Sequence, residues 1–326
     1  MRISIERLKK IIVDIMISNG ATKEDGIIVA EEIVYGQIRG KKSHGLPMLS
    51  AMVKRAQKKS SEIKILKESN QFALIDGCNG IGPVVAKKAM DLSVQKTLEF
   101  GFSIVAVRNP SPFITAGYPV WYVAKKYKLI AIDISVAKSK VAPYGSGEAI
   151  LGTNPIGFAF PTEEYPIVID MATTNISAAK IKQAAENNEK IPDNVAVDRE
   201  GKFTTNPHEA LEGAIVTFGG YKGSAVSLMI ELMAGALLDA KCGNQNGSMR
   251  TMMFYTCRPD LFADMDCVLR NASNLRSDIN NSKSISGVSP RTPGDIAEQI
   301  MINALENGIE LSDSEQNLLR NYGADI

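Results

Sequence analysis

Histidine is scarce in this chain, with His44 and His208 the only two among 326 residues. The four cysteines include no CxxC pair, so neither residue type has the spacing of a structural zinc site. No metal site is predicted. We expect reduced thiols and a cytoplasmic protein, because disulfides depend on an oxidising compartment. Any proton transfer that needs an imidazole near neutral pH has two candidates.

An excess of one charge is also missing. Lysine and arginine total 37 and aspartate and glutamate total 36, for a net charge of +1, which gives no electrostatic footprint for nucleic acid. No apolar run approaches the ~20 residues of a membrane-spanning helix, so no membrane partner is expected. The first 20 residues mix charges into an apolar helical pattern without a small-residue cleavage site, which indicates a helix and no signal peptide.

Helices and strands alternate along the chain, which is typical of an α/β fold. At 326 residues, of which 44% are apolar, the chain is long enough for about two domains. Apolar residues at helical spacing predict helices at both chain ends and over residues 84–99, 116–126, 176–187 and 222–240, with Thr22 capping the second helix. Short apolar runs predict strands at 71–76, 102–107, 129–135, 156–160, 167–170 and 252–257. The polar stretch 271–284 is predicted to be a mobile surface loop.

A glycine-rich turn, GCNGIG at residues 77–82, lies between an expected strand and an expected helix. Its spacing is GxxGxG, whereas a dinucleotide-binding Rossmann turn reads GxGxxG. No acidic residue ends the following strand, where ribose recognition would place one. The sequence therefore indicates a tight turn with a packed helix and disfavours a standard Rossmann site.

Ser43-His44-Gly45 lies in a basic, glycine-flanked segment between two expected helices. A loop histidine beside a serine can donate or accept a proton, and a plain surface histidine is the alternative. Neighbouring residues seldom face each other, and the chain has no GxSxG motif, so the pair does not predict a hydrolase.

Three further segments have residue types that bind polar ligands. LGTNP at 151–155 is a turn whose Thr153 could contact a ligand. Asp170 ends an apolar strand, the position where ligands gather in α/β sheets, although it could equally cap a helix. FGGYKG at 218–223 brings glycines and Lys222 to the start of a long helix, which favours a phosphate, and SPRTPG at 289–294 repeats this pattern with Arg291.

Six segments together resemble the malate/L-lactate dehydrogenase-like family, which has its own NAD(P)-binding fold. They are RGKKSHGL, GCNGIGPVVAKKAM, LGTNPIGFAFPT, IDMATT, KFTTNPHEALEGA and FGGYKGSAVSLMIELMAGALL, in that order. The last is most similar to the branch that reduces Δ1-piperideine-2-carboxylate and Δ1-pyrroline-2-carboxylate. The resemblance spans about residues 20–310 and weakens across 242–285.

The resemblance implies a non-Rossmann α/β fold with a central mixed sheet, assembled as a homodimer. Residues 1–75 and 290–326 would form a helical part that carries Ser43 and His44, and residues 76–289 the central cofactor-binding part. His44 would donate the proton and Ser43 would orient it. The cofactor, NADPH or alternatively NADH, would contact Asp170, Met171, Ala172, Lys222, Gly223, Arg291, Pro293 and Gly294.

Three substrate-facing positions depart from the family pattern. Met48 replaces an arginine, Pro112 replaces a histidine, and Ala178 stands where the family commonly has arginine. Thr153 would still face the substrate. An arginine–carboxylate pair has no equivalent with methionine or alanine. Either the substrate carboxylate is masked or absent, or another cation, such as Lys138, Lys140 or Lys180, replaces the arginines.

The sequence therefore predicts an NAD(P)H-dependent reductase of an imine or carbonyl, such as a cyclic imino acid. One alternative is a dehydrogenase of 2-hydroxy acids such as malate, lactate or sulfolactate. Another is a family member that has lost turnover and serves as a binding subunit.

Overall fold

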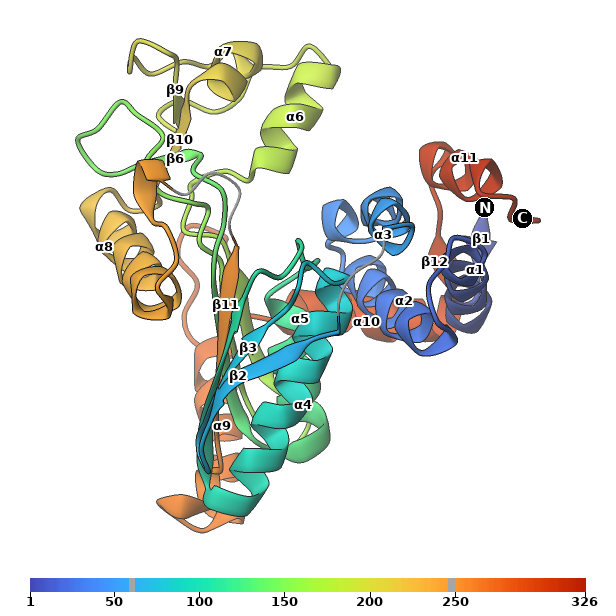
Figure 1. The fold of residues 1–326 in the computed structure, drawn as a ribbon. Coiled ribbons are helices and arrows are strands. Elements are labelled where there is room, and N and C mark those ends of the chain that lie inside the picture. The colour runs from blue at the N-terminus through green and yellow to red at the C-terminus, as the bar shows by residue number, and fades with distance from the viewer. Residues whose placement is uncertain (59–61, 246–249) are drawn as a thin grey trace.

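A seven-stranded mixed sheet forms the centre of the computed structural model, which describes residues 1–58, 62–245 and 250–326 (Figure 1). The strand order is β2-β3-β4-β11-β5-β7-β8, in which β3 and β4 are parallel and the other neighbours antiparallel. The strands are β2 (Lys64–Glu68), β3 (Phe72–Asp76), β4 (Phe102–Arg108), β5 (Ile130–Val136), β7 (Ile156–Phe160), β8 (Ile167–Met171) and β11 (Thr251–Cys257). The predicted α/β class and central mixed sheet are confirmed, whereas β2 was not predicted because its residues are all exposed at the sheet edge.

Helices cover both faces of this sheet. The helices α4 (Gly82–Phe100) and α5 (Gly117–Tyr127) lie on one face and α8 (Tyr221–Ile230) on the other (Figure 1). Successive residues of β5 alternate between the two, so Ala131 packs with α4 and α5 whereas Ile134 packs with Ile230. This alternation buries apolar side chains on both faces.

A helical part built from both chain ends packs beside the sheet. It contains α1 (Ile5–Ser18), α2 (Lys23–Ile38), α3 (Leu49–Ala56), α10 (Asp295–Asn307) and α11 (Asp313–Asn321). The short strands β1 (Arg2–Ile3) and β12 (Ile309–Glu310) pair and bring the termini together. Thr22 caps α2 as predicted, by accepting a hydrogen bond from Asp25 N. The helical part was expected to include residues 1–75. Strands β2 and β3 fall within or at the end of that range, but they belong to the central sheet.

A small lobe lies beyond one end of the sheet, at the top of Figure 1. Its three-stranded sheet joins β6 (Val141–Ala142), β10 (Ala214–Val216) and β9 (Ala196–Val197), and it carries α6 (Ala178–Glu186) and α7 (Pro207–Glu212). Long connections separate these two- and three-residue strands, which is why the sequence showed mainly turn residues here.

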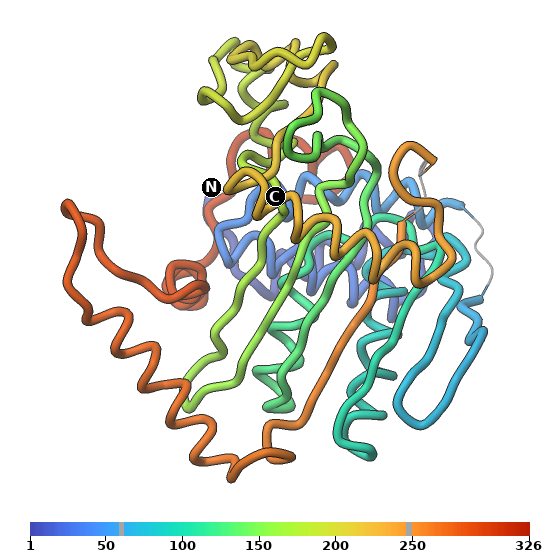
Figure 2. The backbone as a smooth tube through the Cα atoms, turned by 90° about the vertical axis from the view of Figure 1, so that its left-hand side faces the viewer, coloured from blue at the N-terminus to red at the C-terminus, as the bar shows by residue number. Residues whose placement is uncertain are grey.

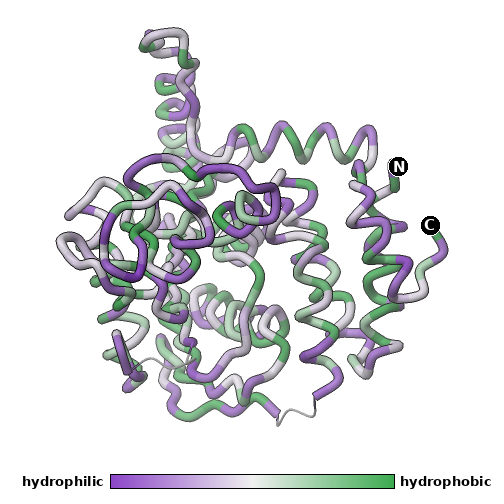
Figure 3. The backbone as a smooth tube through the Cα atoms, turned by 90° about the horizontal axis from the view of Figure 1, so that it is seen from above, coloured by the Kyte–Doolittle hydropathy of each residue, from purple (hydrophilic) through white to green (hydrophobic). Residues whose placement is uncertain are grey.

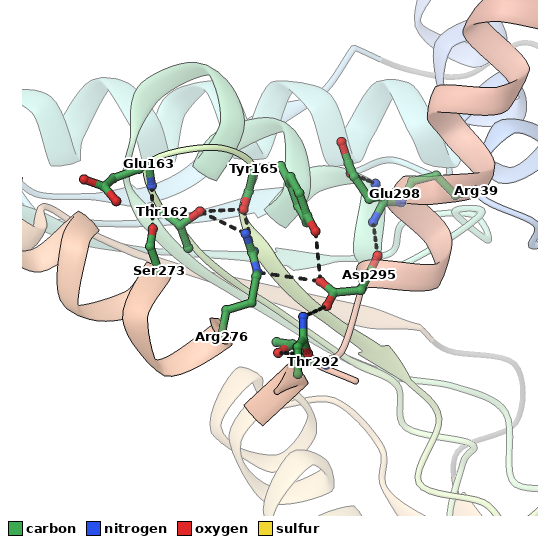
Figure 4. A network of polar contacts seen from close by, with 11 residues as sticks. Arg39, Thr162, Glu163, Tyr165, Ser273, Arg276, Thr292, Asp295 and Glu298 are labelled. Atoms are coloured by element: carbon green, nitrogen blue, oxygen red, sulfur yellow. Dashed lines mark hydrogen bonds and ion pairs between the residues drawn. The ribbon is translucent and has the colours of Figure 1, made fainter. Parts of the chain in front are cut away.

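The prediction of a mobile loop over 271–284 is wrong, because residues 271–280 complete α9 (Met265–Asn280). Arg276 is buried and its guanidinium donates to Tyr165 O at 2.6 Å while lying 4.0 Å from the Tyr165 ring (Figure 4). These long-range contacts hold a polar segment helical. Beyond α9 the chain projects from the body before it returns to α10 (Figures 2 and 3).

The helix predicted over 222–240 is interrupted. After α8 the chain makes a π-helical turn, Glu231–Gly235, and a short 3-10 turn, Ala236–Leu238. The buried Glu231 carboxylate accepts from Asn154 Nδ2 at 2.7 Å and from Gly243 N at 3.1 Å, which ties this turn to neighbouring loops. By length and composition alone, Tyr221–Leu238 is apolar enough to cross a membrane, but one side of it packs on the sheet.

Candidate active site

A cavity of about 300 Å³ lies where the helical part meets the sheet. It opens at the edge where β5 and β8 end and where β7 and β11 begin, so chain segments far apart in sequence meet there. Its polar lining side chains are Lys41, His44, Thr115, Ser135, Thr153, Asp170, Thr174, Ser177 and Arg250. The other lining residues are largely apolar, among them Phe113, Ile114, Val136 and Met171.

His44 lies in a short 3-10 turn, Lys42–His44, that packs closely against α2. A Cβ on Gly36 would lie 2.3 Å from His44 O, and one on Gly45 would lie 2.1 Å from Gln37 Oε1, so both glycines permit the approach. Contrary to the expectation for adjacent residues, Ser43 Oγ lies 2.9 Å from His44 Nδ1. This hydrogen bond fixes the ring and leaves Nε2 without a protein partner in the described part of the chain.

The electrostatic surroundings of His44 favour the neutral ring. Burial is the main cause that lowers the pKa of His44, and Lys41 lowers it further, whereas Asp170 opposes the shift. A histidine with a pKa below its usual value is neutral at pH 7 and ready to exchange a proton.

Asp170 is held at the end of β8 by two side chains. Lys41 Nζ forms an ion pair with its Oδ2 and also donates to Asp170 O at 3.2 Å. Thr115 Oγ1 donates to the same Oδ2 at 2.7 Å. Gly117 allows this packing, because a Cβ there would lie 2.3 Å from Asp170 Oδ2. The charges of Lys41 and Asp170 therefore compensate each other at the cavity wall.

A buried carboxyl group supports the loop between β4 and α5. Glu32 Oε1 accepts from Ile114 N at 3.0 Å and from Thr115 N at 2.8 Å. Burial raises the pKa of Glu32 to about 8, despite these two hydrogen bonds. Glu32 thus anchors the residues that position Thr115 beside Asp170.

Two buried hydroxyls of the cavity wall, Ser135 Oγ and Thr174 Oγ1, have no hydrogen-bond partner among the described residues. A buried hydroxyl without a partner is costly, so a polar ligand there would compensate it. The carboxamide of a nicotinamide ring has both donors and an acceptor and fits this pair. In the part of the chain that the structure describes, no group of three His, Cys, Asp or Glu side chains could hold a metal ion.

The cavity brings together many of the residues singled out from the sequence. His44, Thr153, Asp170, Met171, Ala172 and Ala178 all line it. Met48 does not, because it packs against the helical core, and Pro112 is exposed beside the lining residue Phe113.

The other predicted cofactor residues lie around the cavity without lining it. Lys222 is exposed at the start of α8 and Gly223 is buried there, and this turn is tied to the cavity because Phe218 N donates to Thr173 O at 3.2 Å. Pro293 O accepts from Val168 N at 3.4 Å, which places Pro293 and Gly294 near the start of β8, while Arg291 is exposed. Their role in cofactor binding stays a prediction.

Sequence reasoning missed the cations that do line the cavity, Lys41 and Arg250. Lys41 belongs to the RGKKSHGL segment, where the sequence pattern indicates only a basic stretch. Arg250 has no local signal and reaches the cavity because Thr251 pairs with Val136 of β5. Lys138 and Lys140 line a separate cavity of about 220 Å³, and Lys180 is exposed.

Comparison with known proteins finds oxidoreductases that match most of this chain. A family model for malate/L-lactate dehydrogenase matches residues 3–320. L-sulfolactate dehydrogenase of Methanocaldococcus jannaschii is 36% identical over 326 aligned positions, covering 97% of this chain and 94% of that protein. The solved structure of sulfolactate dehydrogenase from that organism matches with a TM-score of 0.87 at 35% identity, over 99% of this chain and 96% of the other. Delta(1)-pyrroline-2-carboxylate reductase 1 of Burkholderia ambifaria is 30% identical over 241 positions, covering 72% of this chain and 71% of that protein.

Proposed function

The chain belongs to the malate/L-lactate dehydrogenase family of oxidoreductases, and we propose that it interconverts a small 2-hydroxy acid and the corresponding 2-oxo acid with a nicotinamide dinucleotide. The sulfolactate dehydrogenase relative, at 36% identity, supports this reading over the imine reductase predicted from the sequence. Cyclic-imine reduction is the second candidate, supported by the reductase relative at 30% identity.

The observation that carries the proposal is His44, a half-buried imidazole at a cavity wall, with Nδ1 engaged by Ser43 and Nε2 without a partner among the described residues. In reduction, the protonated His44 ring would donate its Nε2 proton to the oxygen that becomes the hydroxyl group and would be left neutral. In oxidation, the neutral ring would accept that proton. General acid–base catalysis of this kind contributes roughly 10²–10⁴ in rate. Ser43 would hold the ring through Nδ1.

The cofactor fits the polar groups of the cavity. When bound, the dihydronicotinamide supplies the hydride. The Ser135 and Thr174 hydroxyls would bind its carboxamide, and Asp170, Met171 and Ala172 would flank it. Lys222, at the start of α8, would contact a phosphate. The apolar lining would exclude water from the reacting atoms. We propose NADPH as the cofactor, with NADH as the alternative.

We also propose that a second copy of this chain covers the apolar surface of the stretch Tyr221–Leu238. Leu232 and Leu237 are 54% and 70% exposed there, and Ile285 and Val288 of the projecting segment are 80% and 71% exposed. Soluble monomers rarely expose apolar patches larger than a few hundred Å². Sedimentation velocity should show a dimer that Leu232→Lys weakens, while Leu98→Lys on the outer side of α4 does not. A monomer at micromolar concentration would contradict this.

Steady-state assays test the function. Pyruvate, oxaloacetate, sulfopyruvate and Δ1-piperideine-2-carboxylate would be offered with NADH or NADPH, and we expect turnover of an oxo acid. His44→Ala should lower kcat about 10²–10⁴-fold while the dissociation constant of the dinucleotide stays within a few-fold, and His208→Ala should change neither.

Full turnover by the His44→Ala variant would remove the proton-donor role. Failure of the wild-type chain to bind either dinucleotide would favour a binding subunit that has lost catalysis.

A further inference from the structure

The cavity holds one charge that nothing in the described protein compensates. Lys41 is paired with Asp170, and burial lowers the pKa of His44, which favours the neutral ring. Arg250 remains, and no ion pair or hydrogen bond of its guanidinium is found within residues 1–58, 62–245 and 250–326. A guanidinium is charged at any physiological pH and has five N–H donors to satisfy.

Arg250 is half-buried, so the lack of a partner is costly. Burial lowers the pKa of Arg250, which means that the charged form has lost solvation. A partly desolvated charge without a partner is unfavourable unless a ligand supplies the opposite charge. An anion in this cavity would therefore gain a charge-assisted, bidentate contact.

The position of Arg250 suits a substrate held opposite His44. Arg250 precedes β11, and the pairing of Thr251 with Val136 brings it to the wall formed by Ser135, Val136 and Ala137. His44 and Lys41 come from the helical part on the other side of the same cavity. Both walls line the same cavity of about 300 Å³, so a substrate bound there can contact Arg250 on one wall and His44 on the other.

We propose that Arg250 binds the carboxylate of the substrate. This inference rests on the proposed function. Since Lys41 is already neutralised by Asp170, the cavity offers one anion site. Phe113, Ile114 and Met171 line the remaining space and suit an apolar side chain. The substrate class is therefore a 2-oxo acid with a single carboxylate, and a second anionic group, as in oxaloacetate or sulfopyruvate, is disfavoured.

The experiment measures anion binding directly, separately from turnover. Calorimetry would follow oxamate, a monocarboxylate analogue of pyruvate, and its neutral ethyl ester, with and without saturating dinucleotide. Loss of one charge-assisted contact corresponds to roughly 10- to 100-fold in affinity. We expect Arg250→Gln to weaken oxamate by this amount and to leave the ester and the dinucleotide unchanged.

Two further variants keep the result interpretable. Arg250→Lys retains the charge and should lose only part of the oxamate affinity. This partial rescue would show that the glutamine variant loses affinity through its lost charge and not through misfolding. Arg258→Gln removes a half-buried arginine that pairs with Asp260 outside the cavity, and this variant should bind both probes like the wild type.

Several results would overturn the proposal. Unchanged oxamate affinity in Arg250→Gln would remove Arg250 from substrate binding, and weaker dinucleotide binding in that variant would assign Arg250 to a cofactor phosphate. A wild-type kcat/KM higher for oxaloacetate than for pyruvate would refute the single-anion class. If oxamate binding depends on Arg250 while no oxo acid is turned over, the anion site stands and the proposed reaction falls.

Discussion

Two regions of the molecule differ in whether their polar groups have partners: the region around the start of α10, and the cavity. Near α10, Arg276 pairs with Asp295 and Arg39 with Glu298, and all four residues are buried (Figure 4). At the cavity, Arg250, Ser135 and Thr174 have no partner among the described residues. The first arrangement fixes the fold, whereas the second leaves binding capacity for a ligand at a cost in stability. Substitutions should therefore affect stability in one region and binding in the other.

The largest effect on stability is expected in the paired region. Arg276→Met leaves Asp295 buried without its cation, and breaking a buried pair in this way costs about 3–5 kcal/mol of the free energy of unfolding. Urea denaturation measures the loss. The dinucleotide dissociation constant of the folded variant should change less than threefold, about 0.7 kcal/mol. Weaker dinucleotide binding without a loss of stability would reverse the contrast between the regions.

Glu32, which supports the cavity loop, should make stability depend on pH. Its pKa is raised from 4.5 to about 8 in the folded protein, so the folded state keeps a proton that the unfolded state releases. Stability is therefore full below pH 4.5 and falls as pH rises to about 8, by up to a few kcal/mol. Glu32→Gln should make the free energy of unfolding, measured by denaturation between pH 5 and 8, depend less on pH. An unchanged slope would show that Glu32 is ionised in the folded protein.

Asp133 lies on β5, two residues before the cavity residue Ser135. It is fully buried, and neither carboxyl oxygen has a partner in the described ranges. Burial raises the pKa of Asp133 well above its usual value, with Asp170 and Glu32 adding to the shift. Asp133→Val should raise the free energy of unfolding at pH 7 by about 1–3 kcal/mol, since it removes an unsatisfied polar group. Asp133→Asn, which stays polar, should give no such gain. Destabilisation by valine would indicate a partner for this carboxyl group.

The smallest effect is expected from Lys41, which influences His44 at the cavity wall. Lys41 lowers the pKa of His44, so Lys41→Met should raise it and keep the ring protonated to higher pH. Reduction needs the protonated ring, and the descending limb of kcat/KM should therefore move to higher pH. The neighbouring exposed Lys42→Met is the matched control and should leave the limb in place. A shift toward lower pH in Lys41→Met would contradict this electrostatic account.

The sequence predicted elements that depend on local patterns. The strands over the apolar runs 102–107 and 156–160 and the Thr22 cap are present as expected, because apolar runs and helix caps are local signals of a few residues. His44 lies at the cavity, and Ser43 and Gly45 are its neighbours in sequence, so the motif could be recognised locally, while its catalytic role stays a prediction.

Features that depend on distant contacts escaped prediction. The polar α9 is helical because Arg276 contacts Tyr165 and Asp295, and α8 gives way to a π turn where Glu231 binds Asn154. Arg250 joins the cavity only through the pairing of β11 with β5. The two walls of the cavity are formed by residues more than 100 positions apart in sequence, and no local motif predicts that they come together.

The most direct test of the account is the titration of the His44 imidazole. Only two histidines occur, so His208→Asn leaves a single ring for NMR. The account predicts a pKa below the ordinary histidine value, and ring resonances that shift when oxamate and the dinucleotide bind. A ring that titrates like an exposed histidine, and that does not respond to either ligand, would contradict the assignment of this cavity as the active site.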